Sequence, residues 1–298
     1  MAQAQVNGIS IEYDVQGAEN TDPLLLIMGL GGQLTRWAQP LMDKFVARGF
    51  RTIRFDNRDV GLSEKFAAVP NLQEVIAARM RGERPNVPYV LEDMAADAVG
   101  VLDHLGIARA HVCGVSMGGM IGQLVAADYP DHVLSLTSIM STTGNPTLTP
   151  AKPEAMAVVM TPAPNPNVDE QAYLDQMVKN AHAIGSPKYP FDEAVLRQRL
   201  LADVKRCYEP LGVARQICAV TATGDRRAKL AKITAPTTVV HGTDDPLVPV
   251  DGGRDTAACI PGAELILVEG MGHDIPPGLY DLFVDAIAKT AARAKLLA

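Results

Sequence analysis

The stretch Gly114-Val115-Ser116-Met117-Gly118 is the most informative part of this chain, because it places a serine on a turn too tight for most side chains. Residues 110–113 (AHVC) before it are typical of a short buried strand, and residues 117–128 (MGGMIGQLVAAD) after it are typical of an apolar helix. Between a strand and a helix, Gly-x-Ser-x-Gly is expected to strain the serine backbone and to leave no room for a Cβ at either glycine.

Such a turn projects the Ser116 hydroxyl beside the backbone N–H of Met117, at a helix N-terminus where the dipole favours negative charge. A nucleophile beside an anion site is the arrangement that acyl transfer needs. The alternative is an ordinary glycine-rich turn of an α/β protein. The interpretation therefore depends on partners elsewhere in the chain.

Composition limits the partners and the location that we expect. The chain has 298 residues with 47% apolar and 20% charged residues, enough for one large α/β core and an accessory element. Its formal net charge is −7 and it has no Lys/Arg-rich run, so we expect no nucleic-acid partner. The N-terminus does not resemble a signal peptide and the longest apolar run, residues 24–30, is too short for a bilayer. We therefore expect no membrane partner and a cytoplasmic location.

The cysteines give no sign of a metal site. Cys113, Cys207, Cys218 and Cys259 are scattered and lack CxxC spacing, so neither a zinc site nor a disulfide framework is expected.

Apolar runs alternate with helical patterns along the first half of the chain. Residues 6–15 alternate around Asn7-Gly8, which predicts an edge hairpin. Unbroken apolar runs suit parallel strands covered on both faces, so we predict an α/β fold with a mostly parallel, doubly wound sheet. The expected strands are 24–28, 52–55, 110–113 and 133–140, and the expected helices between them are 39–48 and 89–105.

Residues 141–232, here called the cap segment, break this alternation. They open with a Pro-rich polar stretch and continue with helical patterns at 170–183, 192–208 and 212–220. Strands at 237–241 and 263–268 and a closing helix at 279–297 then restore the alternation. We therefore predict a core domain made of residues 1–140 and 233–298, with residues 141–232 inserted as a helical cap domain.

A nucleophilic serine needs a base, and near neutral pH that base is a histidine. His273 lies in a loop with glycines on one side and prolines on the other (residues 270–276, GMGHDIP), just after the last strand. That position is the carboxyl edge of the sheet, where ligands bind in such folds. The other five histidines are expected to be ordinary surface or core residues: His104, His111, His132, His182 and His241.

A carboxylate is then needed on another loop of the same edge, to orient the histidine. Residues 241–249 (HGTDDPLVP) follow a strand and offer two neighbours, Asp244 and Asp245. The residues alone leave the choice between them open.

With these residues in the order serine, aspartate, histidine, the chain resembles the α/β-hydrolase fold superfamily. Four further stretches, between residues 24 and 276, resemble landmarks of that family. Within it, the glycine-rich stretch 28–32 and the Asp-Asn-Arg-Asp sequence at 56–59 are most similar to aclacinomycin methylesterase-type carboxylesterases. The four stretches are Met28-Gly29-Leu30-Gly31-Gly32 (oxyanion loop), residues 56–63 (the Asp-x-Arg-x-x-Gly-x-Ser turn), Gly242-x-x-Asp245-x-x-x-Pro249 (acid loop) and Gly272-His273 (base loop).

The resemblance assigns roles to particular residues. It favours Asp245 as the orienting acid, with Asp244 capping the turn, and it makes the N–H of Leu30 the second oxyanion donor beside that of Met117. Met28 stands where the family commonly has histidine, so how this loop is braced is open. A phosphate-binding loop is disfavoured, because the stretch lacks the Lys-Ser/Thr of a P-loop and the spacing of a dinucleotide fingerprint.

The predicted reaction is two-step hydrolysis of a small-molecule ester, which needs neither a metal nor an organic cofactor. Ser116 attacks, His273 transfers the proton and Asp245 holds the imidazole. Methionines make adaptable walls, so the cap segment is expected to contribute to the substrate site, with packing as the alternative role. The substrate-binding candidates are Gly29, Gly31, Trp37, Met156 and Met160.

Three functions are compatible with these residues. A carboxylesterase acting on small to medium uncharged esters leads. A lactone hydrolase is the second, since enol-lactonases of this fold share a Gly-x-Ser-Met-Gly-Gly elbow, and a small-molecule receptor with little turnover is the third. Dehalogenases and epoxide hydrolases of this fold need an aspartate at position 116. A homodimer, with the C-terminal helix 285–298 contributing, is left open.

Overall fold

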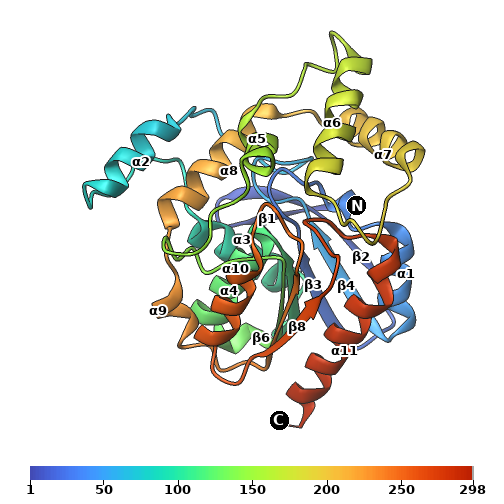
Figure 1. Ribbon diagram of the computed structural model, residues 1–298. Coiled ribbons are helices and arrows are strands. Elements are labelled where there is room, and N and C mark those ends of the chain that lie inside the picture. Colours follow the sequence, from blue (N-terminus) through green and yellow to red (C-terminus); the bar gives the residue numbers. More distant parts are fainter. Residues whose placement is uncertain (297–298) are drawn as a thin grey trace.

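The computed structural model describes residues 1–296 and contains one eight-stranded sheet with the order β1-β2-β4-β3-β5-β6-β7-β8 (Figure 1). The pairs β1–β2 and β2–β4 are antiparallel, and all others are parallel. This confirms the predicted mostly parallel, doubly wound sheet. The strands are β1 (Ala2–Val6), β2 (Ile9–Gln16), β3 (Asp22–Ile27), β4 (Phe50–Phe55), β5 (Ala110–Val115), β6 (Val133–Ile139), β7 (Thr237–Gly242) and β8 (Glu264–Val268).

The predicted edge hairpin is present as β1 and β2. Asn7 and Gly8 between them have φ of 48° and 77°, and a two-residue hairpin turn with positive φ at both positions matches the twist of its strands. The remaining strands begin and end within two residues of their predicted bounds. Strand β5 continues to Val115, so the sheet reaches the residue before Ser116.

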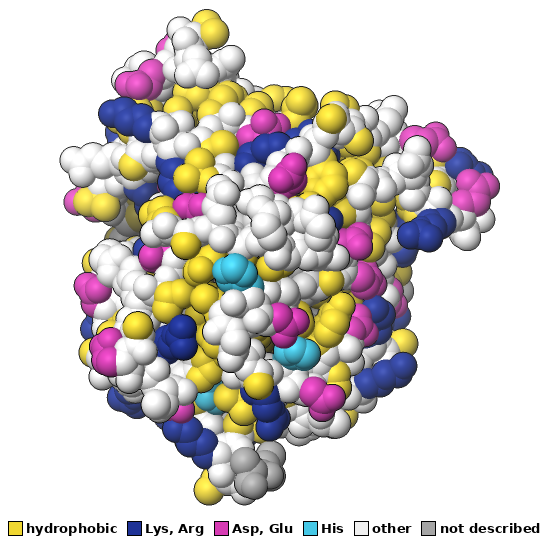
Figure 2. All heavy atoms as spheres, turned by 180° about the vertical axis from the view of Figure 1, so that it is seen from behind, with side chains coloured by type: hydrophobic (Ala, Val, Ile, Leu, Met, Phe, Trp, Pro, Cys, Tyr) yellow, Lys and Arg dark blue, Asp and Glu magenta, His cyan; other side chains and the backbone are white. Residues whose placement is uncertain are grey.

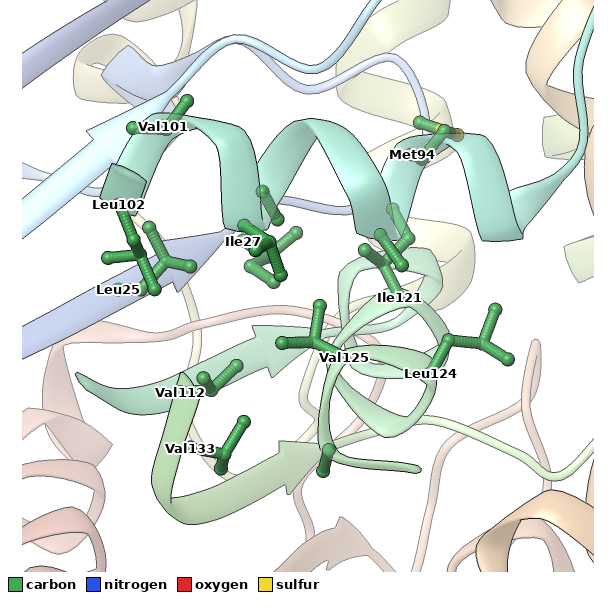
Figure 3. Packing of buried hydrophobic residues seen from close by; sticks show 14 of the residues in the cluster. Leu25, Ile27, Met94, Val101, Leu102, Val112, Ile121, Leu124, Val125 and Val133 are labelled. Carbon is green, nitrogen blue, oxygen red and sulfur yellow. The ribbon is translucent and has the colours of Figure 1, made fainter. Parts of the chain in front are cut away.

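Alternate residues of β3 supply two cores, one on each face of the sheet. Leu25 and Ile27 are fully buried and pack with α3 (Leu91–His104) and α4 (Met117–Asp128), as Figure 3 shows. Leu24 and Leu26 pack on the other face with α1 (Gln39–Ala47) and α11 (Tyr280–Lys295). Each buried leucine contributes about 1.5–3 kcal/mol, so this period-two pattern fixes the strand in register.

The cap segment contains the three predicted helices and two more. Helices α5, α6 and α7 lie together at one end of the molecule (Figure 1), and a cluster around Tyr173, Leu196 and Leu200 joins α6 to α7. The division into a core domain of residues 1–140 and 233–298 and a cap domain of residues 141–232 stays a prediction. The helices are α5 (Pro153–Met160), α6 (Glu170–Ile184), α7 (Glu193–Arg206), α8 (Pro210–Thr223) and α9 (Arg227–Leu230).

Two helices outside the cap segment were not predicted. Helix α2 (Leu72–Met80) buries only Val75 and Ala78, so its sequence shows little amphipathic pattern. Helix α10 (Val250–Cys259) contains Gly252-Gly253, which are poor helix formers. Helix α11 ends at Lys295, whereas its predicted end at Leu297 and the end of the core domain at Ala298 lie outside the described residues.

The face of the molecule opposite to that of Figure 1 carries cationic and anionic side chains interspersed with one another (Figure 2). No helix within residues 1–296 combines the length and the apolar character that crossing a bilayer requires.

Candidate active site

The turn between β5 and α4 has the predicted strained geometry. Ser116 adopts φ 54° and ψ −121°, a conformation that side chains rarely tolerate. A Cβ on Gly114 would lie 2.0 Å from the carbonyl oxygen of Gly118, and a Cβ on Gly118 would lie 2.1 Å from that of Ile27. The chain can therefore follow this turn only because two side chains are absent.

Neighbouring strand β6 holds the turn from below. The N–H of Ser116 donates to the carbonyl oxygen of Ile139 (2.9 Å), and the Ser141 hydroxyl donates to that of Ser116 (2.8 Å). Met140 between these two residues also has a positive φ, 42°. Two strained residues thus lie close together at the carboxyl edge of the sheet.

A continuous chain of hydrogen bonds joins Ser116, His273 and Asp245, which come from the ends of three strands. The Nε2 atom of His273 lies 2.9 Å from Ser116 Oγ, and its Nδ1 atom lies 2.7 Å from Asp245 Oδ2. An ionised carboxylate only accepts hydrogen bonds, so Nδ1 carries the proton and Nε2 is free to accept one from Ser116. The structure therefore brings together the three residues that the sequence singled out.

Asp245 is oriented by its own loop. Its Oδ1 accepts from the N–H groups of Leu247 (2.9 Å) and Val248 (2.8 Å), and its side chain is fully buried. A buried carboxylate needs such partners, because an unpaired one would lose its hydration without compensation. These two bonds leave Oδ2 directed at His273.

The neighbouring carboxylate of Asp244 has a different position. It accepts from the Thr243 hydroxyl (2.6 Å) and from the N–H of Gly270 (2.9 Å), and it is exposed. These hydrogen bonds hold the pKa of Asp244 below its usual range. The residue ties the acid loop to the base loop, while the two ring nitrogens of His273 bond Asp245 and Ser116.

His241 lies beneath the acid loop. Its Nε2 atom donates to the carbonyl oxygen of Val248 (2.7 Å) and lies 3.8 Å from Asp245 Oδ2. Burial lowers the pKa of His241, which favours the neutral ring. The sequence predicted an ordinary surface or core histidine, and the structure places it in the core, where it supports the loop carrying Asp245.

In the oxyanion loop, residues 28–32, the last two backbone amides are occupied. The N–H of Gly32 donates to the carbonyl oxygen of Gly29 (3.1 Å), and the N–H of Gly31 donates to Gln216 Oε1 (2.9 Å). Within residues 1–296, the N–H groups of Leu30 and Met117 have no hydrogen-bond partner. Both open donors lie close to Ser116. Met117 is the next residue in the chain, and Leu30 follows Gly29, on which a Cβ would lie 3.2 Å from that of Ser116.

Residues of the 56–63 turn brace the oxyanion loop. The loop begins with Met28, at a position where the family commonly has a histidine. Asn57 Nδ2 donates to the carbonyl oxygen of Met28 (2.9 Å), and Asp56 Oδ1 accepts from the N–H of Leu34 (2.7 Å). Arg58 is buried and paired with Asp97, with 2.6 Å between Nε and Oδ2. The turn is thus a rigid support for both ends of the loop.

The cap segment holds the base loop. The N–H of Gly272 donates to Ser186 Oγ (2.9 Å), and the N–H of His273 donates to the carbonyl oxygen of Ile184 (2.6 Å). The Ser186 hydroxyl also donates to Asp274, whose pKa is raised by burial. Neither Ser186 nor Gln216 was singled out from the sequence, because no local motif marks them.

The predicted substrate-binding residues lie in different surroundings. Gly29 adjoins Ser116, and Gly31 lies under Val213 of α8. Trp37 is 1% exposed and packs with Leu41 and Met42 in the core, whereas Met156 and Met160 on α5 are 43% and 48% exposed. Their contacts with substrate stay predictions.

The possible metal ligands of the chain are dispersed. Within residues 1–296, no three or more His, Cys, Asp or Glu side chains are grouped in a way that could hold a metal ion.

Comparison with known proteins gives a consistent family. A family model described as alpha/beta hydrolase fold matches residues 22–276. Rhodomycin D methylesterase DnrP of Streptomyces peucetius is 28% identical over 283 residues, which cover 89% of each chain. Putative carbamate hydrolase RutD of Variovorax paradoxus (strain S110) is 29% identical over 245 residues, 80% of each chain.

Solved structures give the same fold. The enol-lactonase from Burkholderia xenovorans LB400 superposes with a TM-score of 0.69 at 24% identity, covering 98% of this chain and 100% of that one.

Proposed function

The chain belongs to the alpha/beta hydrolase fold family, and from this premise we propose that it is a carboxylic ester hydrolase with Ser116 as nucleophile, His273 as base and Asp245 as orienting acid. A fold hosts many activities, so the proposal depends on the site. The observation that carries it is the hydrogen-bonded chain of these three side chains, next to two backbone N–H groups that have no partner within residues 1–296. The methylesterases among its relatives support an ester as substrate.

In the first step, Ser116 Oγ attacks the ester carbonyl carbon and its proton passes to His273 Nε2, 2.9 Å away. The imidazolium that forms is stabilised by Asp245 through the bond at Nδ1. The carbonyl oxygen becomes an oxyanion, and the tetrahedral intermediate collapses to an acyl-enzyme as His273 protonates the leaving alcohol.

The N–H groups of Leu30 and Met117 are the proposed oxyanion donors. The second begins helix α4, so the helix dipole adds to its attraction for negative charge. One such donor is worth about 10² to 10³ in turnover. Water then attacks the acyl-enzyme with the same proton transfers, and no step of this mechanism calls for a metal or cofactor.

The proposed substrates are small to medium uncharged esters. Rhodomycin D methylesterases are among its relatives, so methyl esters are the first compounds to assay. Lactones are the second, because the same triad would open them by the same attack.

The test is Ser116→Ala, assayed on p-nitrophenyl esters from acetate to octanoate and on a panel of lactones. Removing the nucleophile should lower turnover by about 10⁶ and abolish labelling by a fluorophosphonate. The matched control is Ser135→Ala, which removes a buried hydroxyl bonded to His111 (2.8 Å) outside the site and should keep turnover. Near-normal hydrolysis by Ser116→Ala would refute the proposal, and labelling without steady turnover would favour a receptor.

A further inference from the structure

A buried glutamine of the cap segment connects two loops of the core. Gln216 on α8 is fully buried. Its Oε1 accepts from the N–H of Gly31 (2.9 Å), and its Nε2 donates to the carbonyl oxygen of Arg58 (2.8 Å). Both ends of this amide are thus used, as a buried polar side chain requires.

The first of these bonds occupies the amide directly after the proposed oxyanion donor. The second half of the loop offers the N–H groups of Leu30, Gly31 and Gly32. Gln216 takes that of Gly31, and the carbonyl oxygen of Gly29 takes that of Gly32. Of these three amides, that of Leu30 has no partner among the described residues and is free for an oxyanion.

The same bond also fixes a peptide plane that would otherwise be free to turn. Gly31 has φ +63° and no side chain, so its backbone has more freedom than any other residue type. The N–H of Gly31 lies in the same peptide group as the carbonyl of Leu30. The bond to Gln216 therefore fixes the orientation of the peptide group that follows the Leu30 N–H.

Helix α8 presses on this loop at a second point. Val213 lies three residues before Gln216, on the same face of the helix. A Cβ on Gly31 would come within 2.8 Å of Val213 Cγ2. Glycine is therefore needed for the helix to approach closely enough for Gln216 to reach the loop.

The second bond anchors Gln216 to a rigid part of the core. Arg58 is bonded to Asp97 through two of its nitrogens, at 2.6 and 2.7 Å, and the side chain of the preceding residue, Asn57, donates to Met28. The oxyanion loop is thus tied at Met28 and at Gly31 to one and the same turn.

We propose that Gln216 is a positioning residue, which sets the Leu30 N–H for the oxyanion by fixing the Gly31 amide. It acts through the loop and touches neither substrate nor the reacting atoms. The inference rests on the proposed function, since it takes the Leu30 N–H as an oxyanion donor.

The test is Gln216→Met, which keeps the length of the side chain and removes both hydrogen bonds. A misplaced donor should lower kcat for p-nitrophenyl butyrate by about 10 to 10², with a much smaller change in KM. An alkylboronic acid, whose tetrahedral adduct with Ser116 places an oxygen in the oxyanion site, should lose affinity by a similar factor.

Gln123→Met is the matched control. Gln123 is also a fully buried glutamine, on α4, where it bonds Ser138 (3.3 Å) and Arg226 (3.5 Å) and does not contact the oxyanion loop. This variant should lower Tm but keep kcat and boronate affinity. Gln216→Glu covers the case in which Gln216→Met does not fold, because a carboxyl group still accepts from the N–H of Gly31. It should stay closer to the native kcat than Gln216→Met.

Unchanged boronate affinity in Gln216→Met, or equal losses of kcat in Gln216→Met and Gln123→Met, would overturn the proposal. If Gln216→Met does not fold, the proposal would also be overturned by Gln216→Glu losing about 10² in boronate affinity relative to the native protein, because this variant keeps an acceptor for the N–H of Gly31. Failure of the proposed function has a different signature, since Ser116→Ala would then keep its esterase activity. If Ser116→Ala is inactive but Gln216→Met binds the boronate with native affinity, the proposed function stands and the role of Gln216 is refuted.

Discussion

The four loops around Ser116 form two pairs that are held in different ways. The nucleophile turn is bonded to the adjacent strand through Ile139, and Asp245 is bonded to the amides of its own loop. The oxyanion loop and the base loop are braced from the core as well, by Asn57 and Asp244, but each is also bonded to the cap segment, through Gln216 and Ser186. The first pair also meets the beginning of the cap segment, where Ser141 bonds the nucleophile turn and Lys152 bonds the acid loop. The second pair depends on side chains further along that segment, 185 and 86 positions away in sequence.

This difference has a consequence for catalysis under the proposed function. A segment that only covers the substrate would affect binding when it is altered. Here the same segment fixes an oxyanion loop amide and the loop of the base, so changes in it should lower kcat as well as raise KM. Three substitutions, taken from the largest expected effect on turnover to the smallest, test whether the two pairs differ in this way.

Gly114→Ala should have the largest effect, because it acts on the turn held by the sheet. Its Cβ would lie 2.0 Å from a backbone carbonyl oxygen, which cannot move without moving Ser116. We expect loss of folded protein, or a cost above about 4 kcal/mol with no measurable turnover. Soluble yield, Tm and fluorophosphonate labelling measure it.

Gly122→Ala is the control for that substitution. It lies on helix α4, and its Cβ would meet only side chains, of Leu136 and Val112 at 3.3 Å. It should fold and turn over normally. A Gly114→Ala protein as stable as Gly122→Ala would contradict the view that backbone clearance dictates the turn.

The sequence predicted the half of the site that local patterns encode. The Gly-x-Ser-x-Gly turn, the order of the strands along the chain and the loops after β7 and β8 are all marked by short motifs. They brought Ser116, Asp245 and His273 to one edge, because parallel strands end together. The choice of Asp245 over Asp244 needed the family resemblance, and the hydrogen bond to His273 agrees with it.

The other half could not be predicted, for a physical reason. Gln216 and Ser186 are single polar residues in a helical segment, where most such residues face solvent. Their importance comes from tertiary contacts with Gly31 and Gly272, which no pattern of period two or 3.6 records. The bracing of Met28 by Asn57 was missed in the same way, although the 56–63 turn itself was recognised.

Ser186→Ala should have an intermediate effect, because it removes one of the bonds between the base loop and the cap segment and leaves that from the N–H of His273 to Ile184. It leaves the N–H of Gly272 and the carboxyl group of Asp274 without their partner, at a cost of about 1–3 kcal/mol for a buried group. The loss of alignment should lower kcat/KM by about tenfold, which corresponds to a transition state destabilised by about 1.4 kcal/mol. Steady-state kinetics and urea unfolding measure the two effects.

Ser135→Ala again serves as the comparison, because Ser135 is an equally buried serine held in the sheet. It should show a similar loss of stability without the loss of turnover. Equal kinetic losses in the two variants would mean that general destabilisation, and not the base loop, explains the result.

His111→Leu should have the smallest effect on turnover and a clear effect on the pH dependence of stability. Burial lowers the pKa of His111 from 6.5 to about 4, so the folded protein keeps this ring neutral where the unfolded chain binds a proton. Its contribution is fully present above pH 6.5 and is lost as the pH falls towards 4. Between pH 7 and pH 4.5 the native protein should therefore lose about 2 kcal/mol that the variant does not lose.

Urea unfolding of both proteins at pH 7 and pH 4.5, with kcat measured at pH 7, tests this expectation. His111 on β5 pairs with Ser135 on β6 and contacts none of the four loops, so its replacement should leave kcat within about twofold. If the free energy of unfolding of His111→Leu depends on pH as that of the native protein does, the acid sensitivity arises from other groups. A variant with impaired kcat would show that the sheet transmits changes to the site, and the contrast between loops held by the sheet and loops held by the cap segment would lose its basis.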